Sequence, residues 1–394
     1  MKRKISILPI AILSFLFFLI NWYVFSGLST ISQSMGLAFV FWGTVLLSGF
    51  ALVYSIFNLK SRGMDWLFKW STHVFLALFV AELVFIIFLL AGDGYRLIRG
   101  GARNIYWVEL ALFFFVLTLL VFLYGILRGK YAYRVIRHTL FFEDLPADFD
   151  GFTITQISDI HAGSFNNPKA LQKGIDLVKA QQSDLFVFTG DLVNNTADEI
   201  KPWLAHFSQI RAPYGQFSVL GNHDYGDYIA WKSDADKRAN LQQLKMYHAE
   251  LGYRLLLDEH VELYKNGQKI ILAGVENWGV GFGERGDLRK ALSGTANGDF
   301  KILLSHDPTH WEKQVKIFPS KIHLTLAGHT HGMQFGIEAF GIKWSPVKYR
   351  YPHWAGLISE NGRFLNINRG FGFIGFSGRI GIWPEITVIE LKRS

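Results

Sequence analysis

The hydrophobic positions follow two different patterns along the chain, and the first pattern fills its N-terminal third. Four apolar runs of 19 to 22 residues precede residue 130, and they are Ile5–Phe25, Gly36–Phe57, His73–Ala91 and Tyr106–Ile126. Each run is long enough to cross a hydrocarbon core of roughly 30 Å as a helix. A soluble helix bundle is the alternative, but its helices would need a polar outer face. The pattern therefore predicts an all-α bundle of four transmembrane helices over residues 1–127.

The second pattern, from Gly151 onward, alternates short apolar runs with amphipathic segments. It predicts strands at Phe152–Ser158, Leu185–Thr189, Gln216–Leu220, Arg254–Leu257, Lys269–Ala273, Lys301–Ser305, His323–Ala327, Gly356–Ile358, Phe364–Ile367 and Ile386–Leu391. It predicts helices at Pro168–Gln181, Asp198–Ile210 and Ala239–Leu251. Such alternation favours sheets covered by helices. We therefore expect an α/β domain over residues 151–394, with residues 128–150 as a linker that contains a lead-in strand at Thr139–Phe142.

The positive charge of the chain belongs to the predicted membrane part and its flanks. Residues 1–138 hold 13 Lys/Arg and 4 Asp/Glu, a balance of +9. The remaining residues hold 27 Lys/Arg and 28 Asp/Glu, a balance of −1. The basic balance is therefore no evidence for nucleic acid as a partner, whereas a lipid bilayer is expected as one.

The Lys/Arg residues between the apolar runs predict a topology. Three precede the first run, three lie in the second loop, three lie in the third loop and four follow the fourth run, and they are Lys2, Arg3, Lys4, Lys60, Arg62, Lys69, Arg96, Arg99, Arg103, Arg128, Lys130, Arg134 and Arg137. With the N-terminus inside, ten face the inside and three the outside. We therefore expect an integral, multi-pass protein of the inner or plasma membrane with its C-terminal domain in the cytoplasm.

A cleaved signal peptide is the alternative for the first apolar run, because a basic start precedes it. No small-x-small cleavage site follows the run, which is also long for the apolar region of a signal peptide. The chain has no cysteine, which excludes disulfides and thiolate metal sites without fixing the compartment.

Five short polar motifs follow one another in the second half of the chain. They are Asp159-Ile160-His161, Gly190-Asp191, Gly221-Asn222-His223-Asp224, His306 within Ser305-His306-Asp307-Pro308, and Gly328-His329-Thr330-His331. Four of them begin where a predicted strand ends, at Ser158, Thr189, Leu220 and Ser305. Because polar groups past the carboxyl ends of neighbouring strands form sites, the five motifs are expected to meet.

The residue types in these motifs suit a pair of divalent cations. Asp159 and His161 lie two residues apart, as do His329 and His331, so on an extended segment each pair would project from one face. The carboxylate of Asp191 has two oxygens and can bridge two ions about 3.5–4 Å apart. An amide oxygen of Asn222 and an imidazole nitrogen of His306 complete a set that suits Mn²⁺, Fe or Zn²⁺.

Each motif also has a structural interpretation when it is taken alone. Gly-Asp and Gly-Asn-His-Asp are common in turns, and a lone histidine is more often a hydrogen-bonded polar residue than a ligand. The glycines Gly190, Gly221 and Gly328 suit tight turns and close backbone approach. The ordered combination, with its members after strands, favours the metal site over these separate interpretations.

The order of these motifs resembles the calcineurin-like metallophosphoesterase superfamily over residues from about 150 to the C-terminus. Further segments resemble its bacterial membrane-associated branch, which includes the YkuE and YaeI proteins, and they are Leu145-Pro146, Thr155–His161, Leu303–Pro308, Asn368-Arg369-Gly370, Arg379-Ile380-Gly381 and Pro384-Glu385-Ile386. Met333 is a departure, since the branch usually has glycine there; a larger side chain can narrow the site mouth. Four spans are also more than the single anchor or export signal common in the branch.

The resemblance implies a four-layer αββα sandwich and a role for each motif residue. Asp159, His161, Asp191 and His331 would hold one divalent metal ion, and Asp191, Asn222, His306 and His329 would hold the other. Water bridging the two ions would attack phosphorus in line. His223 would stay off the metals and protonate the leaving oxygen, with Asp224 able to orient its ring.

Three residues outside the metal set are further candidates. Arg369 and Arg379 can grip phosphate through bidentate contacts, and a salt bridge to Asp or Glu is the equal alternative for each. Glu82 lies inside the third apolar run, where an acid is costly and a functional candidate by default. A hydrogen bond to a neighbouring helix is the alternative for Glu82.

The expected function is metal-dependent hydrolysis of a phosphate ester or pyrophosphate at the membrane surface. A lipid-linked substrate is preferred, because only about 20 residues separate the last span from the first strand. Some relatives in the superfamily cleave the pyrophosphate of UDP-diacylglucosamine, which makes that lipid one candidate. A phosphatase or phosphodiesterase for soluble nucleotides or phosphoproteins is the enzymatic alternative. A membrane receptor or scaffold with a structural metal site is the non-enzymatic one, and the presence of His223 argues against it.

Overall fold

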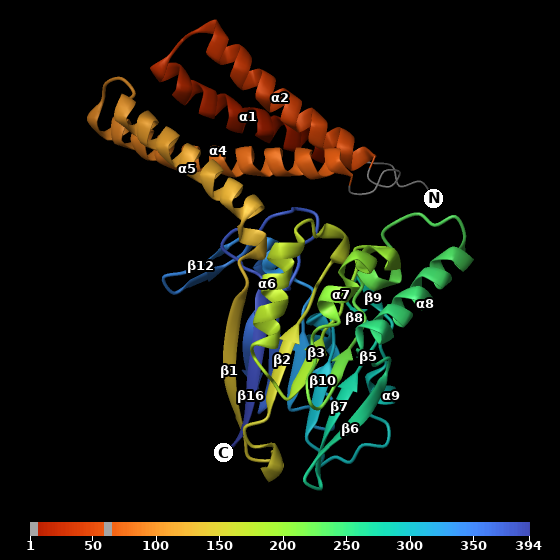
Figure 1. Cartoon of the computed structure of the whole chain (residues 1–394). Coiled ribbons are helices and arrows are strands. Elements are labelled where there is room, and N and C mark those ends of the chain that lie inside the picture. Colours follow the sequence, from red (N-terminus) through yellow and green to blue (C-terminus); the bar gives the residue numbers. More distant parts are fainter. Residues whose placement is uncertain (1–6, 59–64) are drawn as a thin grey trace. The chain divides into compact units, whose positions relative to one another are not determined.

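The computed structural model describes residues 7–58 and 65–394, and it separates into two compact units, Met1–Gly125 and Ile126–Ser394 (Figure 1). The basic residues Lys2, Arg3, Lys4, Lys60 and Arg62, which enter the topology prediction, lie outside the described residues. The predicted domain limits after residues 127 and 150 stay predictions.

The N-terminal unit is built from long apolar helices. They are α1 (Ile7–Ile31), α2 (Met35–Phe57), α4 (Trp66–Arg99) and α5 (Ile105–Leu127). The side chains of Ser34 and Asp65 cap α2 and α4 by accepting the backbone N–H groups of Leu37 and Phe68. In the described part of the chain, all four helices are long and apolar enough to cross a membrane, which confirms the four predicted spans.

The third span differs from its prediction in length. Helix α4 has 34 residues, and Arg96 and Arg99 lie in its last turn and not in a separate loop. A helix of that length is about 51 Å long, so part of it extends beyond a hydrocarbon core of roughly 30 Å or the helix is strongly tilted. The basic side chains at this end also interact favourably with the helix dipole.

Glu82 lies on α4 with only 4% of its surface exposed. Its Oε2 atom has no hydrogen-bond partner in the described part of the chain, so the interhelical hydrogen bond offered as an alternative is absent there. An apolar cavity of about 220 Å³ adjoins Glu82 and is lined by residues of α1, α2, α4 and α5. The acid is therefore an unpaired polar group within an apolar bundle.

In residues 126–394, all of which the structure describes, two six-stranded sheets form the C-terminal unit (Figure 1). The first sheet has the order β1 (Arg134–Phe142), β16 (Glu385–Arg393), β2 (Thr153–Ile157), β3 (Leu185–Phe188), β4 (Gln216–Ser218) and β5 (Arg254–Leu255). The second has the order β14 (Gly356–Glu360), β15 (Arg363–Ile367), β11 (Leu324–Ala327), β10 (Lys301–Leu304), β7 (Gln268–Gly274) and β6 (Glu259–Lys265). Strands β2 to β5 run parallel, and so do β7, β10, β11 and β15.

Three hydrophobic clusters show how the sheets and helices are layered. One cluster joins residues of both sheets, such as Ile154 and Val187 with Leu272 and Leu304, and therefore lies between them. A second packs the other face of the first sheet against α6 (Pro168–Lys179), α7 (Leu204–Phe207) and α8 (Asp234–Leu251). A third packs the second sheet against α9 (Leu288–Ala291) and the turn Trp311–Val315. The predicted four-layer αββα arrangement is confirmed.

Two short sheets complete the unit, and several elements differ from the predicted ones. Strands β8 (Trp278–Gly279) and β9 (Gly283–Glu284) pair with each other, as do β12 (Ile337–Ala339) and β13 (Ile342–Trp344). The predicted helix Asp198–Ile210 is a 3₁₀ segment, Ala197–Trp203, followed by one turn of α7, because Pro202 removes a backbone donor. The lead-in strand is longer than predicted, because Arg134–Phe142 pairs in parallel with Glu385–Arg393 along its whole length.

Candidate metal centre

The five polar motifs follow five parallel strands and come together at the carboxyl-terminal edge of both sheets. Asp159, Asp191 and Asn222 follow β2, β3 and β4 of the first sheet. His306 and His329 follow β10 and β11 of the second sheet. The backbone joins the motifs across the sheets, since the N–H group of His329 donates to the Asp159 carboxylate at 3.0 Å. The expected meeting of the motifs is therefore present in the structure.

One group of possible metal ligands consists of Asp159, His161 and His331. One ligand atom from each lies within 4.8 Å of the others, and all three residues are buried. Nε2 of His331 lies 3.3 Å from Oδ1 of Asp159 and 3.0 Å from Nε2 of His161. These atoms surround a space that one cation can fill.

A second group consists of Asp191, His306 and His329, again with ligand atoms within 4.8 Å of one another. The amide of Asn222 joins this group, because its Oδ1 lies 2.8 Å from Nδ1 of His329 and 3.2 Å from Nε2 of His306. Nδ1 of His306 donates to the Thr189 carbonyl oxygen at 2.7 Å, so Nε2 is the ring nitrogen that faces the site.

The carboxylate of Asp191 reaches both groups through one oxygen. Its Oδ2 lies 3.5 Å from Nε2 of His161 in the first group and 3.3 Å from Nε2 of His306 in the second. The other oxygen, Oδ1, accepts the backbone N–H of His223 at 2.8 Å. Asp191 therefore stands where a bridging ligand between two ions would stand.

The short distances between histidine ring nitrogens indicate whether these donors fit cations. Nε2 of His161 and Nε2 of His331 are 3.0 Å apart, and Nδ1 of His329 and Nε2 of His306 are 3.3 Å apart. Lone pairs of neutral imidazoles repel at such distances unless a proton or a cation lies between them. With two carboxylates in addition, the donors fit divalent metal ions that accept nitrogen and oxygen ligands.

The backbone conformation at the motifs corrects one sequence-based expectation. Asp159 and His161 do not lie on an extended segment, and neither do His329 and His331. All four have positive φ angles, at 52°, 48°, 75° and 51°, and Asp191 has 62°. The side chains converge because the chain turns through the left-handed region at these residues, and not because a pleat places them on one face. Such conformations cost about 1–3 kcal/mol each and cluster at functional sites.

Two glycines show why the turns need residues without a side chain. A Cβ atom on Gly221 would lie 2.2 Å from Oδ1 of Asp191, and one on Gly328 would lie 2.0 Å from Oγ of Ser158. Both are impossible contacts, so the expectation of close backbone approach at these positions is confirmed.

Burial and neighbouring charges set the electrostatics of the site. Burial raises the pKa of Asp159, but attraction to His331 and His306 outweighs it, so the net pKa lies below the usual range. Burial lowers the pKa of His306, but the Asp191 carboxylate beside it raises the net value to about 10. Burial holds the pKa values of His161 and His329 below the usual range. Their rings are therefore neutral and can donate lone pairs to a metal.

His223 lies beside the metal groups, with its ring centroid 5.0 Å from that of His161. Its Nδ1 donates to the backbone oxygen of Asn194 at 2.8 Å, so Nε2 is the position where the ring gains and loses a proton. The Asn194 carbonyl thus holds the ring, and the predicted role of Asp224 in orienting it stays a prediction. Sequence reasoning missed Asn194, because a backbone carbonyl gives no signal in the residue types.

The Asp224 carboxylate fastens the backbone of two site loops. It accepts the N–H groups of Gly221, Asp191, Leu192 and Val193 at 2.8 to 3.2 Å, and it is fully buried. Burial, with the Asp191 charge, raises the pKa of Asp224 to about 7, while the backbone donors lower it. Asp224 therefore positions the loops that carry Asp191 and Asn222.

Two residues without a sequence-based assignment hold the ring of His329. Its Nε2 lies 2.9 Å from the hydroxyl of Tyr351 and 3.3 Å from Oδ2 of Asp307, and the Asp307 side chain is fully buried. The place of Asp307 in the motif Ser305-His306-Asp307-Pro308 was a signal from which its role could have been predicted. No motif marks Tyr351. These contacts leave Nδ1 of His329 to face the second group.

We expect Asp307→Asn and Tyr351→Phe each to weaken metal binding by about 10–100-fold, the usual effect of changing a group behind a metal-bound histidine. Titration of metal-free protein with Mn²⁺ or Zn²⁺, followed by calorimetry, measures this change. Tyr349→Phe is the control, because Tyr349 is exposed two residues away and should bind metal as the unchanged protein does. Equal affinity in all variants would show that these groups do not support His329.

The two arginines predicted as phosphate contacts are occupied by protein groups. Arg369 forms ion pairs with Glu385 and Glu338, which is the salt-bridge alternative. Arg379 is fully buried and donates to the carbonyl oxygens of Gly370 and Gly372 at 3.1 and 2.6 Å. The salt-bridge alternative is therefore present for Arg369, whereas Arg379 binds carbonyl oxygens, and a substrate role for either residue stays a prediction.

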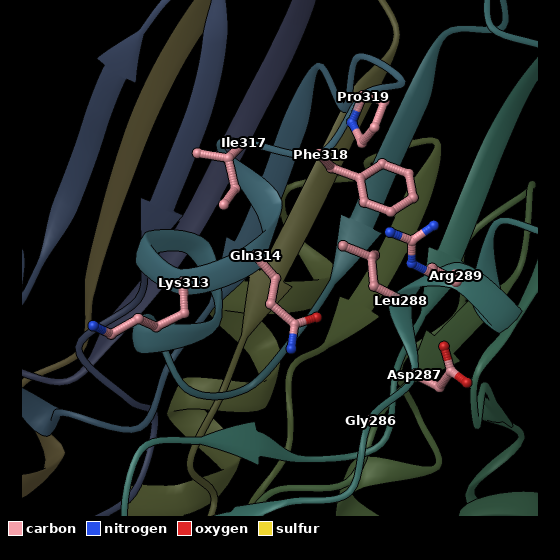
Figure 2. Close-up of a pocket in the computed structure, with 9 residues that line it drawn as sticks. All are labelled: Gly286, Asp287, Leu288, Arg289, Lys313, Gln314, Ile317, Phe318 and Pro319. Carbon is pink, nitrogen blue, oxygen red and sulfur yellow. The ribbon is translucent and has the colours of Figure 1, made fainter.

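Met333 and a separate cavity complete the surroundings of the site. Met333 is 58% exposed and has a φ angle of 55°, a backbone conformation that glycine adopts more easily than methionine. Figure 2 shows a cavity of about 510 Å³ between the Gly286–Arg289 segment and the Lys313–Pro319 segment. None of its lining residues belongs to the motifs, so this cavity is not the predicted site.

Comparisons with known proteins agree with this geometry. The family model described as "Calcineurin-like phosphoesterase" matches residues 152–333. The family model described as "Probable Calcineurin-like phosphoesterase, transmembrane domain" matches residues 3–130. Both halves of the chain therefore match families that are named for the same activity.

Three curated relatives show the same resemblance. The uncharacterized metallophosphoesterase YkuE of Bacillus subtilis is 30% identical over 259 residues, which are 65% of this chain and 84% of YkuE. A zebrafish transmembrane protein with metallophosphoesterase domain is 26% identical over 291 residues, 71% of this chain and 62% of that protein. The UDP-2,3-diacylglucosamine pyrophosphatase LpxG of Chlamydia trachomatis is 27% identical over 280 residues, 61% of this chain and 84% of LpxG.

The fold, the two groups of possible metal ligands and these matches lead to one assignment. The helices that can cross a membrane make the protein an integral membrane protein. The chain belongs to the calcineurin-like metallophosphoesterase family and is a membrane-anchored enzyme of that family.

Proposed function

We propose that this enzyme hydrolyses a lipid-linked phosphate ester or pyrophosphate at the membrane surface with two divalent metal ions. The observation that carries the proposal is Oδ2 of Asp191, which lies 3.5 Å from His161 and 3.3 Å from His306 and so belongs to both ligand groups. A single structural metal would need only one of the two groups. The pair of groups supports an enzyme over a receptor with a structural metal.

The proposed ligand sets follow these groups. Asp159, His161, Asp191 and His331 hold one ion, and Asp191, Asn222, His306 and His329 hold the other. Two such ions, when bound, activate water for attack on phosphorus and neutralise charge on the phosphoryl oxygens. The mixed oxygen and nitrogen donors suit Mn²⁺, Fe or Zn²⁺.

His223 supplies the proton for the leaving oxygen. Its Nδ1 is held by the Asn194 carbonyl, which fixes the ring and points the exchangeable proton on Nε2 away from that contact. The His223 ring also packs against Tyr228 at 4.5 Å, and the Tyr228 hydroxyl accepts a hydrogen bond from the Asn222 amide at 2.7 Å. An imidazole fixed in this way is suited to general acid catalysis.

Arg350 is an exposed cation beside the site and is a further candidate, besides Arg369 and Arg379, for contact with substrate phosphate. Its guanidinium lies 4.9 Å from the ring of Phe282 and 5.8 Å from the ring of Tyr351. Both of those residues contact His329, with Phe282 at 4.6 Å between ring centroids. A guanidinium held there can bind a second phosphate of a pyrophosphate substrate.

The substrate class rests on tethering and on one relative. Only residues 128–133 separate the end of α5 from the start of β1, so the chain keeps the start of β1 within roughly 20 Å of the end of the last span. The relative LpxG is named for a lipid pyrophosphate substrate. Soluble nucleotides and phosphoproteins are the alternative substrates, and no nucleic acid is expected.

Turnover of a generic aryl phosphodiester with added Mn²⁺ tests for phosphoesterase activity, and loss of activity with a chelator is the control. Incubation of the purified enzyme with membrane lipid extracts then tests the substrate class. We expect mass spectrometry to show the loss of phosphorylated lipids and the matching dephosphorylated or cleaved products. Cleavage of nucleotides or phosphopeptides, with the lipid extract unchanged, would move the enzyme to the alternative class.

We propose that the catalytic domain faces the cytoplasm. The Lys/Arg count places three basic residues, Arg96, Arg99 and Arg103, on the side away from the cytoplasm. Of these, Arg103 pairs with Asp93 at 2.6 Å and also donates to the Ser26 carbonyl oxygen at 2.8 Å. The Tyr23 hydroxyl donates to the same Asp93 carboxylate at 2.7 Å. The positive charge of Arg103 is therefore neutralised locally, which supports the orientation given by the Lys/Arg count.

Single cysteines test this orientation in a chain that has no native cysteine. Cysteines at Ser32, Ser61, Asn104 and Ser394 are probed in intact cells with a membrane-impermeant maleimide. We expect Ser32→Cys and Asn104→Cys to react, and Ser61→Cys and Ser394→Cys to react only after lysis. Reaction at position 394 in intact cells would place the domain on the other side and replace cytosolic lipids with envelope phosphate esters as substrates.

A further inference from the structure

The hairpin formed by β12 and β13 projects from the body of the C-terminal unit (Figure 1). Ile337 pairs with Trp344, and Ala339 pairs with Ile342. Because side chains alternate along a strand, these four residues share one face of the hairpin, while the pair Glu338 and Lys343 occupies the other. The hairpin therefore has one apolar and one polar face.

The polar face is the one fastened to the domain. Glu338 forms an ion pair with Arg369, whose side chain is 6% exposed. Lys343 donates from Nζ to the backbone oxygen of Ala355 at 2.6 Å. A soluble protein usually packs the apolar face of such a hairpin inward, and this hairpin has the opposite arrangement.

The apolar face and the tip of the hairpin are exposed. Phe340 at the tip is fully exposed, at 103%, and its neighbours on the hairpin and on the two adjoining turns are exposed by about half or more. We call these residues the apolar finger: Met333 (58%), Ile337 (49%), Phe340, Ile342 (55%) and Tyr349 (78%). Exposed apolar residues gathered on one hairpin and its adjoining turns favour an interaction site, because exposing them to water is unfavourable.

The apolar finger carries the features of a membrane-surface anchor. Aromatic and aliphatic side chains at an exposed tip can enter the boundary between headgroups and acyl chains, and basic residues beside them attract anionic lipids. Lys348 and Arg350 are exposed on either side of Tyr349. A bilayer is always in reach, since residues 128–133 alone connect α5 to β1. We propose that the apolar finger inserts into the surface of the anionic bilayer that holds the four spans.

Both ends of the apolar finger lead directly into the metal centre. Met333 lies two residues after His331, and Tyr349 lies two residues before Tyr351, whose hydroxyl contacts Nε2 of His329 at 2.9 Å. Insertion would therefore hold the site next to the lipid headgroups. Insertion itself requires only a membrane-anchored chain, whereas this consequence for turnover rests on the proposed lipid-linked substrate.

Site-directed fluorescence measures insertion in the full-length protein. Phe340→Cys is labelled with an environment-sensitive dye in vesicles of phosphatidylcholine and phosphatidylglycerol, some of which contain lipids with a doxyl quencher on the acyl chain. Tyr264→Cys is the control, because Tyr264 is 58% exposed on β6, at the edge of the second sheet. We expect blue-shifted emission and strong quenching at position 340 only. A label at position 340 that is not quenched would overturn the proposal.

A kinetic comparison separates insertion from the proposed substrate class. We expect Phe340→Asp to slow turnover of a bilayer-embedded phosphate ester by about tenfold or more, with Phe340→Trp near the unchanged enzyme. Turnover of a soluble aryl phosphodiester should stay within about twofold, and Tyr264→Asp should change neither. Equal losses on both substrates would contradict a role at the lipid surface. If position 340 is quenched but the unchanged enzyme cleaves no lipid ester, insertion is supported and the lipid-linked substrate is rejected.

Discussion

Asp191→Asn should empty the metal centre and abolish turnover. The substitution removes the charge of the one carboxylate that reaches both ligand groups, at 3.5 Å from His161 and 3.3 Å from His306. Each ion then loses a charged ligand, and a neutral amide oxygen is a much weaker bridge between two cations. We expect metal analysis to fall from about two ions per chain to less than one, with no turnover above background.

Asp198→Asn is the matched control for this prediction. Asp198 is exposed and contacts no proposed metal ligand; its carboxylate pairs with Lys201 at 2.8 Å and accepts from the Tyr247 hydroxyl at 3.4 Å, so its loss should change neither metal content nor turnover. Circular dichroism of both variants checks that the fold is retained. Two tightly bound ions and normal turnover in Asp191→Asn would reject the bridging role.

His223→Ala should leave both ions in place and slow turnover by about 10²–10⁴, the usual contribution of a general acid. No hydrogen bond joins the ring to a proposed metal ligand, because its Nδ1 donates to the Asn194 carbonyl oxygen. Metal analysis and turnover on one preparation therefore separate catalysis from metal binding. A loss of metal in His223→Ala would show that His223 is a ligand.

The leaving group gives a sharper test of the same residue. An alkoxide leaves only when it is protonated, whereas nitrophenolate is stable enough to leave without a proton. We expect the loss in His223→Ala to be large for an alkyl phosphate ester and small for a nitrophenyl ester. Equal losses on both esters would exclude proton donation to the leaving oxygen.

The sequence was enough to predict the elements that form because of their own pattern of apolar and polar residues. Apolar runs that end in a glycine and a polar residue marked β3, β4 and β11, and the lengths of the apolar runs marked four spans. Strand β6 (Glu259–Lys265) was missed, because an edge strand mixes charged and apolar residues and resembles a surface loop. The hairpin β12–β13 was missed because each strand has only three residues.

The sequence predicted which residues form the site but not how the backbone arranges them. The motifs named Asp159, His161 and the other candidate ligands, but nothing in Asp-Ile-His indicates a left-handed backbone. That conformation depends on distant contacts, such as the hydrogen bond from the His329 N–H to Asp159. The supporting roles of Asn194, Asp307 and Tyr351 likewise depend on residues that meet only in the folded chain.

The four backbone hydrogen bonds accepted by Asp224 have a consequence for how the enzyme acquires its metals. They join the loop of Asp191 to the loop of Gly221 and Asn222 through protein atoms alone. The entropy lost in ordering these loops is therefore part of folding and does not reduce the free energy of metal binding. The metal-free protein should keep these four amides among its slowest to exchange with deuterium, with Asp191 and Asn222 held in place before the first ion arrives.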